Sequence, residues 1–236
     1  MPVADFASFA SLKGEFEAEG LTREELAVEV IFARARGIDY LVKIGGCEAK
    51  SDLDYLGRLG VTSVVAPMIE SGFAMRKYME MLPPRGFHHV GVTIETVHAV
   101  ERIEELLDAG TRLNNVTIGR SDLTASFGGA GVDSDATMAM VRAVAQAGRR
   151  RGLEVTMGGG INLQTRALLR EDAALRGLLH CVETRKVVMP VDRFAEDGVL
   201  EDAIAVELEL LELRTGPAAE AVARSTKRIA QLRERV

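Results

Sequence analysis

Charged side chains stand where short runs of β-branched and apolar residues end. Glu95 follows the run HVGVTI, Asp122 follows VTIGRS, and Lys43 ends the run YLVK. Two carboxylates that meet, together with water and a substrate oxygen, form the oxygen-rich site that Mg²⁺ or Mn²⁺ prefers. The alternative for both acids is a structural role, because a carboxylate in the first turn of a following helix stabilises that helix.

The segment KGEFEAEG at residues 13–20 carries charges on alternate positions. Side chains two apart in a strand share one face, so we expect Lys13, Glu15 and Glu17 to point into the interior of the fold. A buried line of carboxylates is costly unless cations neutralise it, which favours a polar site over an apolar core. The alternative is that this segment is already a solvated loop.

Short β-type runs alternate with helical patterns along most of the chain. This alternation predicts an α/β fold, a (β/α)8 TIM-type barrel in which the charged strand ends form the active site. Seven strands are evident, so the eighth is irregular or missing; FASFA near the N-terminus or a split of residues 178–189 could supply it. The predicted strands span residues 11–17, 40–46, 62–70, 89–96, 114–120, 153–159 and 178–189.

The pattern changes near residue 192. Residues 199–213 and 218–236 read as two amphipathic helices joined at Thr215-Gly216-Pro217, and neither alternates with a strand. We therefore expect a barrel domain at 1–191 and a helical extension at 192–236, which serves as a closing helix and an oligomerisation arm. A homo-oligomer is the expected assembly.

Composition excludes several classes of protein. The 236 residues are 47% hydrophobic and carry a net charge of −6, which suits one globular domain and argues against nucleic-acid binding. No apolar run approaches the roughly 18 residues of a membrane span, so no membrane contact is expected. Cys47 and Cys181 show no metal or disulfide spacing, and a reduced, cytoplasmic setting follows.

Three segments together resemble the HpcH/HpaI aldolase/citrate lyase family of the phosphoenolpyruvate/pyruvate barrel superfamily. They are VVAPMIES at 64–71, GVTIETVHAVERIEELL at 91–107 and VTIGRSDLTASFG at 116–128. The resemblance implies that Glu95 and Asp122 ligate a divalent metal, Mg²⁺ or Mn²⁺. It also implies a class II aldolase, a carbon–carbon lyase that acts on a 2-oxoacid such as pyruvate, and an aldehyde, through a metal-stabilised enolate.

Two positions depart from the family pattern. Family members carry arginine in a V-R-P context where this chain has Lys43 in VKIGG, and G-E-H where it has Phe16 in GEF. Lysine lacks the planar fork of arginine, so it would clamp an oxoacid more weakly. Glu15 or Glu17 would then take over proton transfer, and Lys43 is a further candidate catalytic residue. The candidate substrate contacts are Lys43, Arg120, Ser121 and Arg185.

The alternatives retain the same fold. An acyl-CoA lyase similar to the citrate lyase β chain would share the metal pair, although no basic patch for a CoA tail is evident. A phosphoenolpyruvate-using transferase is more distant. The non-enzymatic alternative is a barrel that binds metal and oxoacid without turnover, which the replacements at Phe16 and Lys43 would support.

Overall fold

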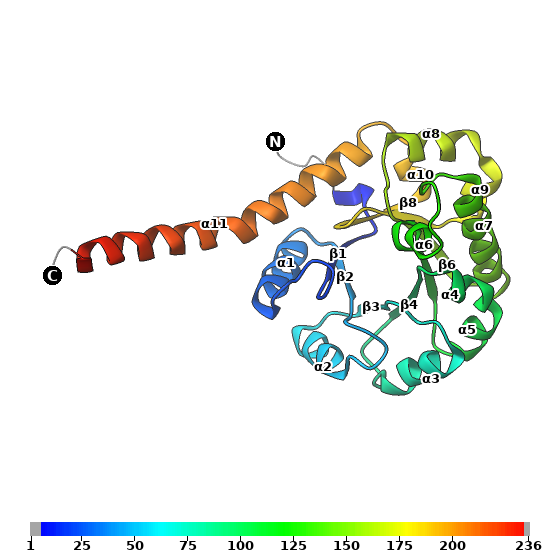
Figure 1. The fold of residues 1–236 in the computed structure, drawn as a ribbon, viewed down its shortest axis with the longest axis horizontal. Helices are drawn as coiled ribbons and strands as arrows, with labels where there is room; N and C mark the ends of the chain where they lie inside the picture. The colour runs from blue at the N-terminus through cyan, green and yellow to red at the C-terminus, as the bar shows by residue number, and fades with distance from the viewer. Residues whose placement is uncertain (1–5, 234–236) are drawn as a thin grey trace.

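Eight strands form a closed barrel in the computed structural model, which describes residues 6–233 (Figure 1). The strands, in the order in which they neighbour one another, are β1 (Ser11–Glu15), β2 (Asp39–Lys43), β3 (Ser63–Ala66), β4 (His89–Ile94), β5 (Asn115–Gly119), β6 (Glu154–Gly158), β7 (Cys181–Glu183) and β8 (Val187–Pro190). The TIM-type barrel predicted from the sequence is confirmed.

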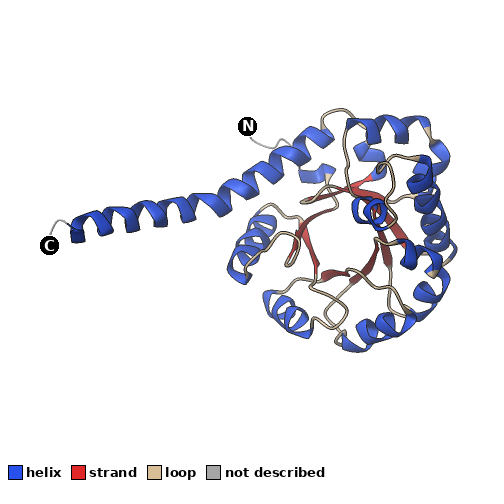
Figure 2. Ribbon diagram, in the orientation of Figure 1, coloured by secondary structure: helices blue, strands red, loops and turns tan. Residues whose placement is uncertain are grey.

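The helices surround the ring of strands (Figure 2). They are α1 (Arg23–Ala35), α2 (Lys50–Leu59), α3 (Gly72–Met81), α4 (Val97–Glu101), α5 (Ile103–Ala109), α6 (Arg120–Ser126), α7 (Asp135–Arg150), α8 (Leu163–Glu171), α9 (Ala173–Leu178), α10 (Val191–Phe194) and α11 (Val199–Arg233). A 3-10 turn, Phe6–Ser8, precedes β1, so FASFA does not supply the missing strand.

The eighth strand runs against its neighbours. Strands β1 to β7 pair in parallel, whereas β8 pairs antiparallel with both β7 and β1. The chain between Glu183 and Val187 is a short turn, which can join antiparallel strands but cannot make the long crossover that a parallel strand requires. The irregular strand is therefore the split segment at 178–189.

Alternation along the strands divides an apolar shell from a polar barrel interior. The outward residues Leu12, Val42 and Val116 are fully buried against the helices. The inward residues at the carboxyl end of the barrel are charged, among them Lys13 and Glu15 of β1. Below them Leu41, Val65 and Val188 form a separate apolar layer across the barrel. This layer lies beneath the charged residues and separates them from the opposite end of the barrel, where Leu41 and Val188 line a second hollow.

Local capping signals define where the first helix starts. The Thr22 hydroxyl accepts from the Glu25 backbone N–H, and the Glu25 carboxylate accepts from the Thr22 N–H in return. This reciprocal arrangement satisfies donors that a helix start leaves unpaired. It fixes α1 directly after the loop that carries Glu17 and Glu19 over the carboxyl end of the barrel.

The C-terminal extension is one helix, and the break predicted at 215–217 is wrong. Helix α11 continues through that segment, where the Thr215 hydroxyl donates to the Leu211 carbonyl inside the helix. A proline deprives a helix of one backbone donor without necessarily ending it. Ala203, Val206 and Leu210 are buried against the barrel, and the helix then projects away from the body (Figure 1). No helix among residues 6–233 is long and apolar enough to cross a membrane.

A candidate active site at the carboxyl end of the barrel

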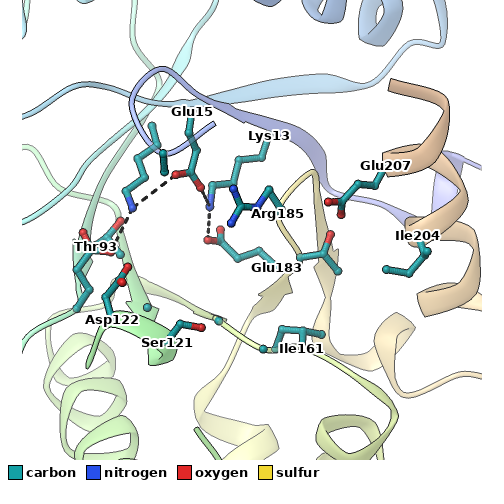
Figure 3. Close-up of a pocket in the computed structure, with 17 residues that line it drawn as sticks. Lys13, Glu15, Thr93, Ser121, Asp122, Ile161, Glu183, Arg185, Ile204 and Glu207 are labelled. Carbon is teal, nitrogen blue, oxygen red and sulfur yellow. Dashed lines mark hydrogen bonds and ion pairs between the residues drawn. The ribbon is translucent and has the colours of Figure 1, made fainter. Parts of the chain in front are cut away.

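The polar pocket opens at the carboxyl ends of the strands, where barrel enzymes place their active sites. It has a volume of about 320 Å³ and is continuous with a hollow of about 600 Å³, since both include Glu15, Lys43, Glu95 and Asp122. Helix α11 contributes Ile204 and Glu207 to the outer wall (Figure 3). The remaining charged lining residues are Lys13, Glu183 and Arg185.

Glu95 and Asp122 both face this pocket from adjacent strand ends. Glu95 follows β4 and is 2% exposed, and Asp122 lies in the first turn of α6, directly after β5. Neither acid caps its helix: Thr96 caps α4, and α6 has no side-chain cap. A carboxylate in the first turn of a helix is favourable, so Asp122 also fits the structural role, whereas Glu95 lies before the N-cap Thr96 and does not. Both carboxylates line the pocket.

The Glu95 carboxylate is held in place by two donors. One oxygen accepts from the Met68 backbone N–H at 3.1 Å, and the other accepts from Lys43 Nζ at 3.2 Å. Met68 has φ +53°, a left-handed conformation that is unusual for a side chain with a Cβ, and this conformation lies at the loop that supplies the N–H. Burial raises the pKa of Glu95 above its usual value, although Lys43 and the Met68 N–H oppose that shift.

A chain of ion pairs crosses the pocket floor (Figure 3). Lys13 Nζ lies 2.6 Å from Glu183 Oε1 and 3.0 Å from Glu15 Oε1, and Lys43 Nζ lies 3.7 Å from Glu15 Oε2. Burial alone would lower the pKa of Lys13, but Glu183 and Glu15 more than offset it and raise that pKa. Burial would raise the pKa of Glu15, but Lys13 and Lys43 outweigh it and lower that pKa. Lys13 and Glu15 are therefore held as ions near neutral pH.

Of the two predicted proton-transfer acids, Glu15 lies in the pocket and Glu17 does not. Glu17 follows the end of β1, is exposed and lines only the adjoining hollow. Phe16 points to the other face, where its ring packs edge-on against Tyr55 with centroids 6.5 Å apart. The prediction that all the alternate charges of 13–17 enter the interior therefore holds for Lys13 and Glu15 only, because the strand ends at Glu15.

The prediction of Arg120 as a substrate contact is wrong. Its guanidinium is fully buried outside the barrel, where it donates to Asp133 Oδ1 at 2.6 Å and to the Gly158 carbonyl at 3.2 Å. Gly119 faces the pocket, so the next residue along the chain faces the opposite side. Ser121, by contrast, lines the pocket and is exposed.

Arg185 also lines the pocket, as predicted, from the turn between β7 and β8. It is exposed, and within residues 6–233 it makes no hydrogen bond or ion pair. Lys13 and Lys43, the other lining cations, are both bound to carboxylates. Arg185, whose charge helps to lower the pKa of Glu15, is thus the lining cation with no carboxylate in direct contact among the described residues.

Sequence reasoning did not select Thr93, Ile204 or Glu207 as site residues, although all three line the pocket. Glu183 was noted in the sequence as a charge at a strand end but was given no role, and it lines the pocket as well. Thr93 could have been found by alternation, since it lies two residues before Glu95 on β4. Ile204 and Glu207 could not, because only the docking of α11 brings them to the mouth.

The donor set fits a divalent cation. The pocket lining holds five carboxylates and three cationic side chains, an excess of two negative charges when all are ionised. Oxygen ligands are those that Mg²⁺ and Mn²⁺ prefer, and both ions commonly retain water ligands. No group of three or more His, Cys, Asp or Glu side chains among residues 6–233 has the arrangement of a complete metal site. Glu95 and Asp122 would therefore hold the cation together with water or substrate.

The protein is a (β/α) barrel, and acidic side chains line a pocket at the carboxyl ends of its strands. This is where enzymes of this fold have their active sites. The sequence profile of the HpcH/HpaI aldolase/citrate lyase family matches residues 25–175, and the chain belongs to this family of aldolases and lyases. The comparison with curated proteins finds no match.

Solved structures share the fold at low sequence identity. An HpcH/HpaI aldolase from Desulfitobacterium hafniense DCB-2 superposes with a TM-score of 0.62 at 16% identity, covering 87% of this chain and 85% of that chain. A family protein from Burkholderia cenocepacia J2315 gives 0.64 at 16% identity, covering 89% and 87%. The citrate lyase β subunit from M. tuberculosis, complexed with oxaloacetate and magnesium, gives 0.58 at 20% identity, covering 80% and 87%.

Proposed function

We propose that this protein is a divalent-metal-dependent carbon–carbon lyase of the class II aldolase type, which acts on a 2-oxoacid such as pyruvate and on an aldehyde. The observation that carries the proposal is the pair of carboxylates, Glu95 and Asp122, at adjacent strand ends in a pocket with excess negative charge. The citrate lyase β subunit of the same fold, solved with magnesium and oxaloacetate, supports a cation and a 2-oxoacid as ligands.

Glu95 and Asp122 would hold Mg²⁺ or Mn²⁺, which when bound acts as a Lewis acid that stabilises the negative charge of an enolate. The apolar layer of Leu41, Val65 and Val188 lies beneath the ion pairs of the pocket and separates it from the opposite end of the barrel, so solvent would reach a bound substrate from the mouth.

Three basic side chains have separate tasks in this proposal. Lys13 is locked between Glu15 and Glu183, so its ammonium keeps the floor neutralised and is not free to form a Schiff base. Arg185 is unpaired among the described residues and would bind the carboxylate of a substrate. Lys43 lies between Glu15 and Glu95 and would contact the oxoacid beside the cation.

Proton transfer falls to Glu15. Its carboxylate lines the pocket next to the Lys43 ammonium, and its lowered pKa keeps it ionised and able to accept a proton, although as a weaker base than a free glutamate. A carboxylate in hydrogen-bond reach of a substrate carbon or of one bridging water is a competent general base. Ser121 lines the same pocket and would donate its hydroxyl to a substrate oxygen.

The test is exchange of the pyruvate methyl protons with D₂O, followed by NMR in the presence of Mg²⁺ or Mn²⁺. Exchange should occur with the wild type and vanish in Glu95→Gln and in Asp122→Asn. Asp54→Asn, an exposed carboxylate on α2 away from the pocket, is the control that should exchange normally. If the wild type exchanges neither pyruvate nor another 2-oxoacid with any divalent cation, the aldolase proposal is refuted.

An acyl-CoA lyase of the citrate lyase β type is the second candidate, supported by the exposed Arg185 at the pocket, which could receive an anionic group, and by the likeness to the citrate lyase β subunit. Cation-dependent release of a 2-oxoacid from an acyl-CoA thioester, without pyruvate exchange, would establish it. Tight cation-dependent binding of a 2-oxoacid with neither reaction would instead indicate a non-catalytic barrel.

The setting and assembly complete the proposal. Cys47 and Cys181 are both free thiols, which supports a reducing, cytoplasmic location. The part of α11 beyond Leu210 projects from the barrel, and we propose that it joins copies of this chain into a homo-oligomer. Sedimentation of the intact protein tests this, and a monomeric mass would contradict it.

A further inference from the structure

Glu95 already has a cation partner from the chain itself. Lys43 Nζ lies 3.2 Å from Glu95 Oε2, and the two side chains are 15% and 2% exposed. A carboxylate this buried requires compensation of its charge, and Lys43 supplies it. Lys43 therefore holds one of the oxygens that a metal ion would use.

Of the two donors to Glu95, only Lys43 can leave. The Met68 N–H belongs to the backbone of the loop after β3, whereas the lysine ammonium ends a flexible stem with rotatable donors. A second carboxylate is ready to receive it, because Glu15 Oε2 is 3.7 Å from the same Nζ. Lys43 can thus exchange one carboxylate for the other and remain compensated.

We propose that Lys43 is a built-in counter-ion that competes with the divalent cation for Glu95, and that cation binding moves its ammonium to Glu15 and the open pocket. This inference rests on the proposed function and concerns the regulation of the same site. Two positive charges repel each other when they share one carboxylate in a partly buried site. The cation would therefore load first, and only then would Lys43 be free to contact an anionic substrate.

Among the cationic side chains of the pocket, Lys43 should be the one that competes with the divalent cation for Glu95, because it is the one that contacts Glu95. Arg185 carries the same charge in the same pocket but makes no ion pair with any described residue. Removing its charge changes the total charge of the pocket by the same amount as removing that of Lys43. Arg185 is therefore the matched control for a general electrostatic effect.

The experiment is Mn²⁺ binding measured by electron paramagnetic resonance, with thermal unfolding curves to verify that each variant folds. Lys43→Met should bind Mn²⁺ about tenfold more tightly than the wild type, because it removes a contacting like charge. Arg185→Met, at longer range and exposed to solvent, should change the affinity by no more than about threefold. Lys43→Arg keeps the charge and should not tighten binding.

A second measurement uses the wild type alone, in case Lys43→Met does not fold. The Lys43 side-chain Cε–Hε signal, assigned by its loss in Lys43→Arg, should shift as diamagnetic Mg²⁺ is added. An unchanged signal at saturating Mg²⁺ would overturn the inference. The inference would also be overturned if Lys43→Met bound Mn²⁺ no more tightly than the wild type. It would equally be overturned if Arg185→Met gained as much Mn²⁺ affinity as Lys43→Met.

Failure of this inference can be distinguished from failure of the proposed function. If the wild type binds Mn²⁺ and exchanges pyruvate protons while Lys43→Met has an unchanged affinity, only the role of Lys43 is refuted. If neither the wild type nor any Lys43 variant binds Mn²⁺ at millimolar concentration, the cation-dependent function is refuted, and the competition with it.

Discussion

Replacing Lys13 by methionine tests the ion pairs on the pocket floor. The Lys13 ammonium contacts Glu183 and Glu15, and all three side chains are buried, between 7% and 11% exposed. Methionine is close in length to the aliphatic stem of lysine, so the change removes the charge with little change in packing. It leaves Glu183 without the lysine partner and Glu15 with Lys43 at 3.7 Å.

Breaking a buried ion pair by removing one partner typically costs about 3–5 kcal/mol, because the remaining charge stays desolvated. For a chain of this size 1 kcal/mol corresponds to about 2–4 °C in Tm, so the melting temperature should fall by about 6–20 °C. Urea unfolding at pH 7 measures the free energy of unfolding directly.

The pH dependence that Glu15 contributes should weaken in this variant. In the wild type the pKa of Glu15 in the folded state is lowered, so its contribution to stability is present above the unfolded pKa and is lost as the pH falls through the folded pKa. In Lys13→Met, Glu15 stays buried but loses its closer lysine partner and retains only Lys43, so the folded pKa of Glu15 should rise from its lowered value. Lowering the pH from 7 to 5 should then recover part of the lost stability relative to the wild type.

A double variant isolates the cause. Lys13→Met/Glu183→Gln removes one of the two carboxylates, and it should be at least about 1 kcal/mol more stable than Lys13→Met alone because the pair is directly coupled. Two results would refute the reasoning: a Lys13→Met protein as stable as the wild type at pH 7, or a double variant less stable than the single one.

Other parts of the structure carry three further predictions. Asp133→Asn leaves the buried Arg120 guanidinium without its carboxylate and should lower the free energy of unfolding in urea by about 2–3 kcal/mol. This is less than the cost for a fully buried pair, because Asp133 is about one-third exposed. Unchanged stability would contradict the burial of Arg120. Gly91→Ala should cost about 1–3 kcal/mol by the same assay, since its Cβ would lie 2.8 Å from Val65 in the barrel interior, and a neutral effect would contradict that packing. Truncation after Arg214 should change Tm by no more than about 2 °C, because no buried α11 side chain described here lies beyond Leu210. The same truncation should lower the sedimenting mass to that of a monomer. An oligomer that persists would show that the end of α11 does not join the copies.

The strand ends were predictable because alternation and residue type are local properties. In β1, Leu12 and Gly14 face the helices while Lys13 and Glu15 face the barrel, as a period of two requires. Glu95 was predicted for the same reason, as the first acid after a β-type run. Arg120 was misplaced because the strand ends at Gly119, and the side chain after it turns outward into the layer of helices.

The direction of β8 and the continuity of α11 were not predictable from local pattern. An apolar run such as Val187–Met189 looks the same whichever way it crosses the barrel, and only pairing with β1 and β7 shows its direction. The Gly216-Pro217 pair is a common helix break, but the helical geometry persists through it.

By itself the sequence determined the alternation of strands and helices, the polar face of β1 and the carboxylates at the ends of β4 and β5, because each depends on neighbours along the chain. Only the tertiary structure decided which of these charges meet. Lys13 pairs with Glu183 across 170 residues and Lys43 with Glu95 across 52. Such partners are set by closure and register of the barrel, which bring distant strand ends to one mouth, and no local pattern encodes that closure.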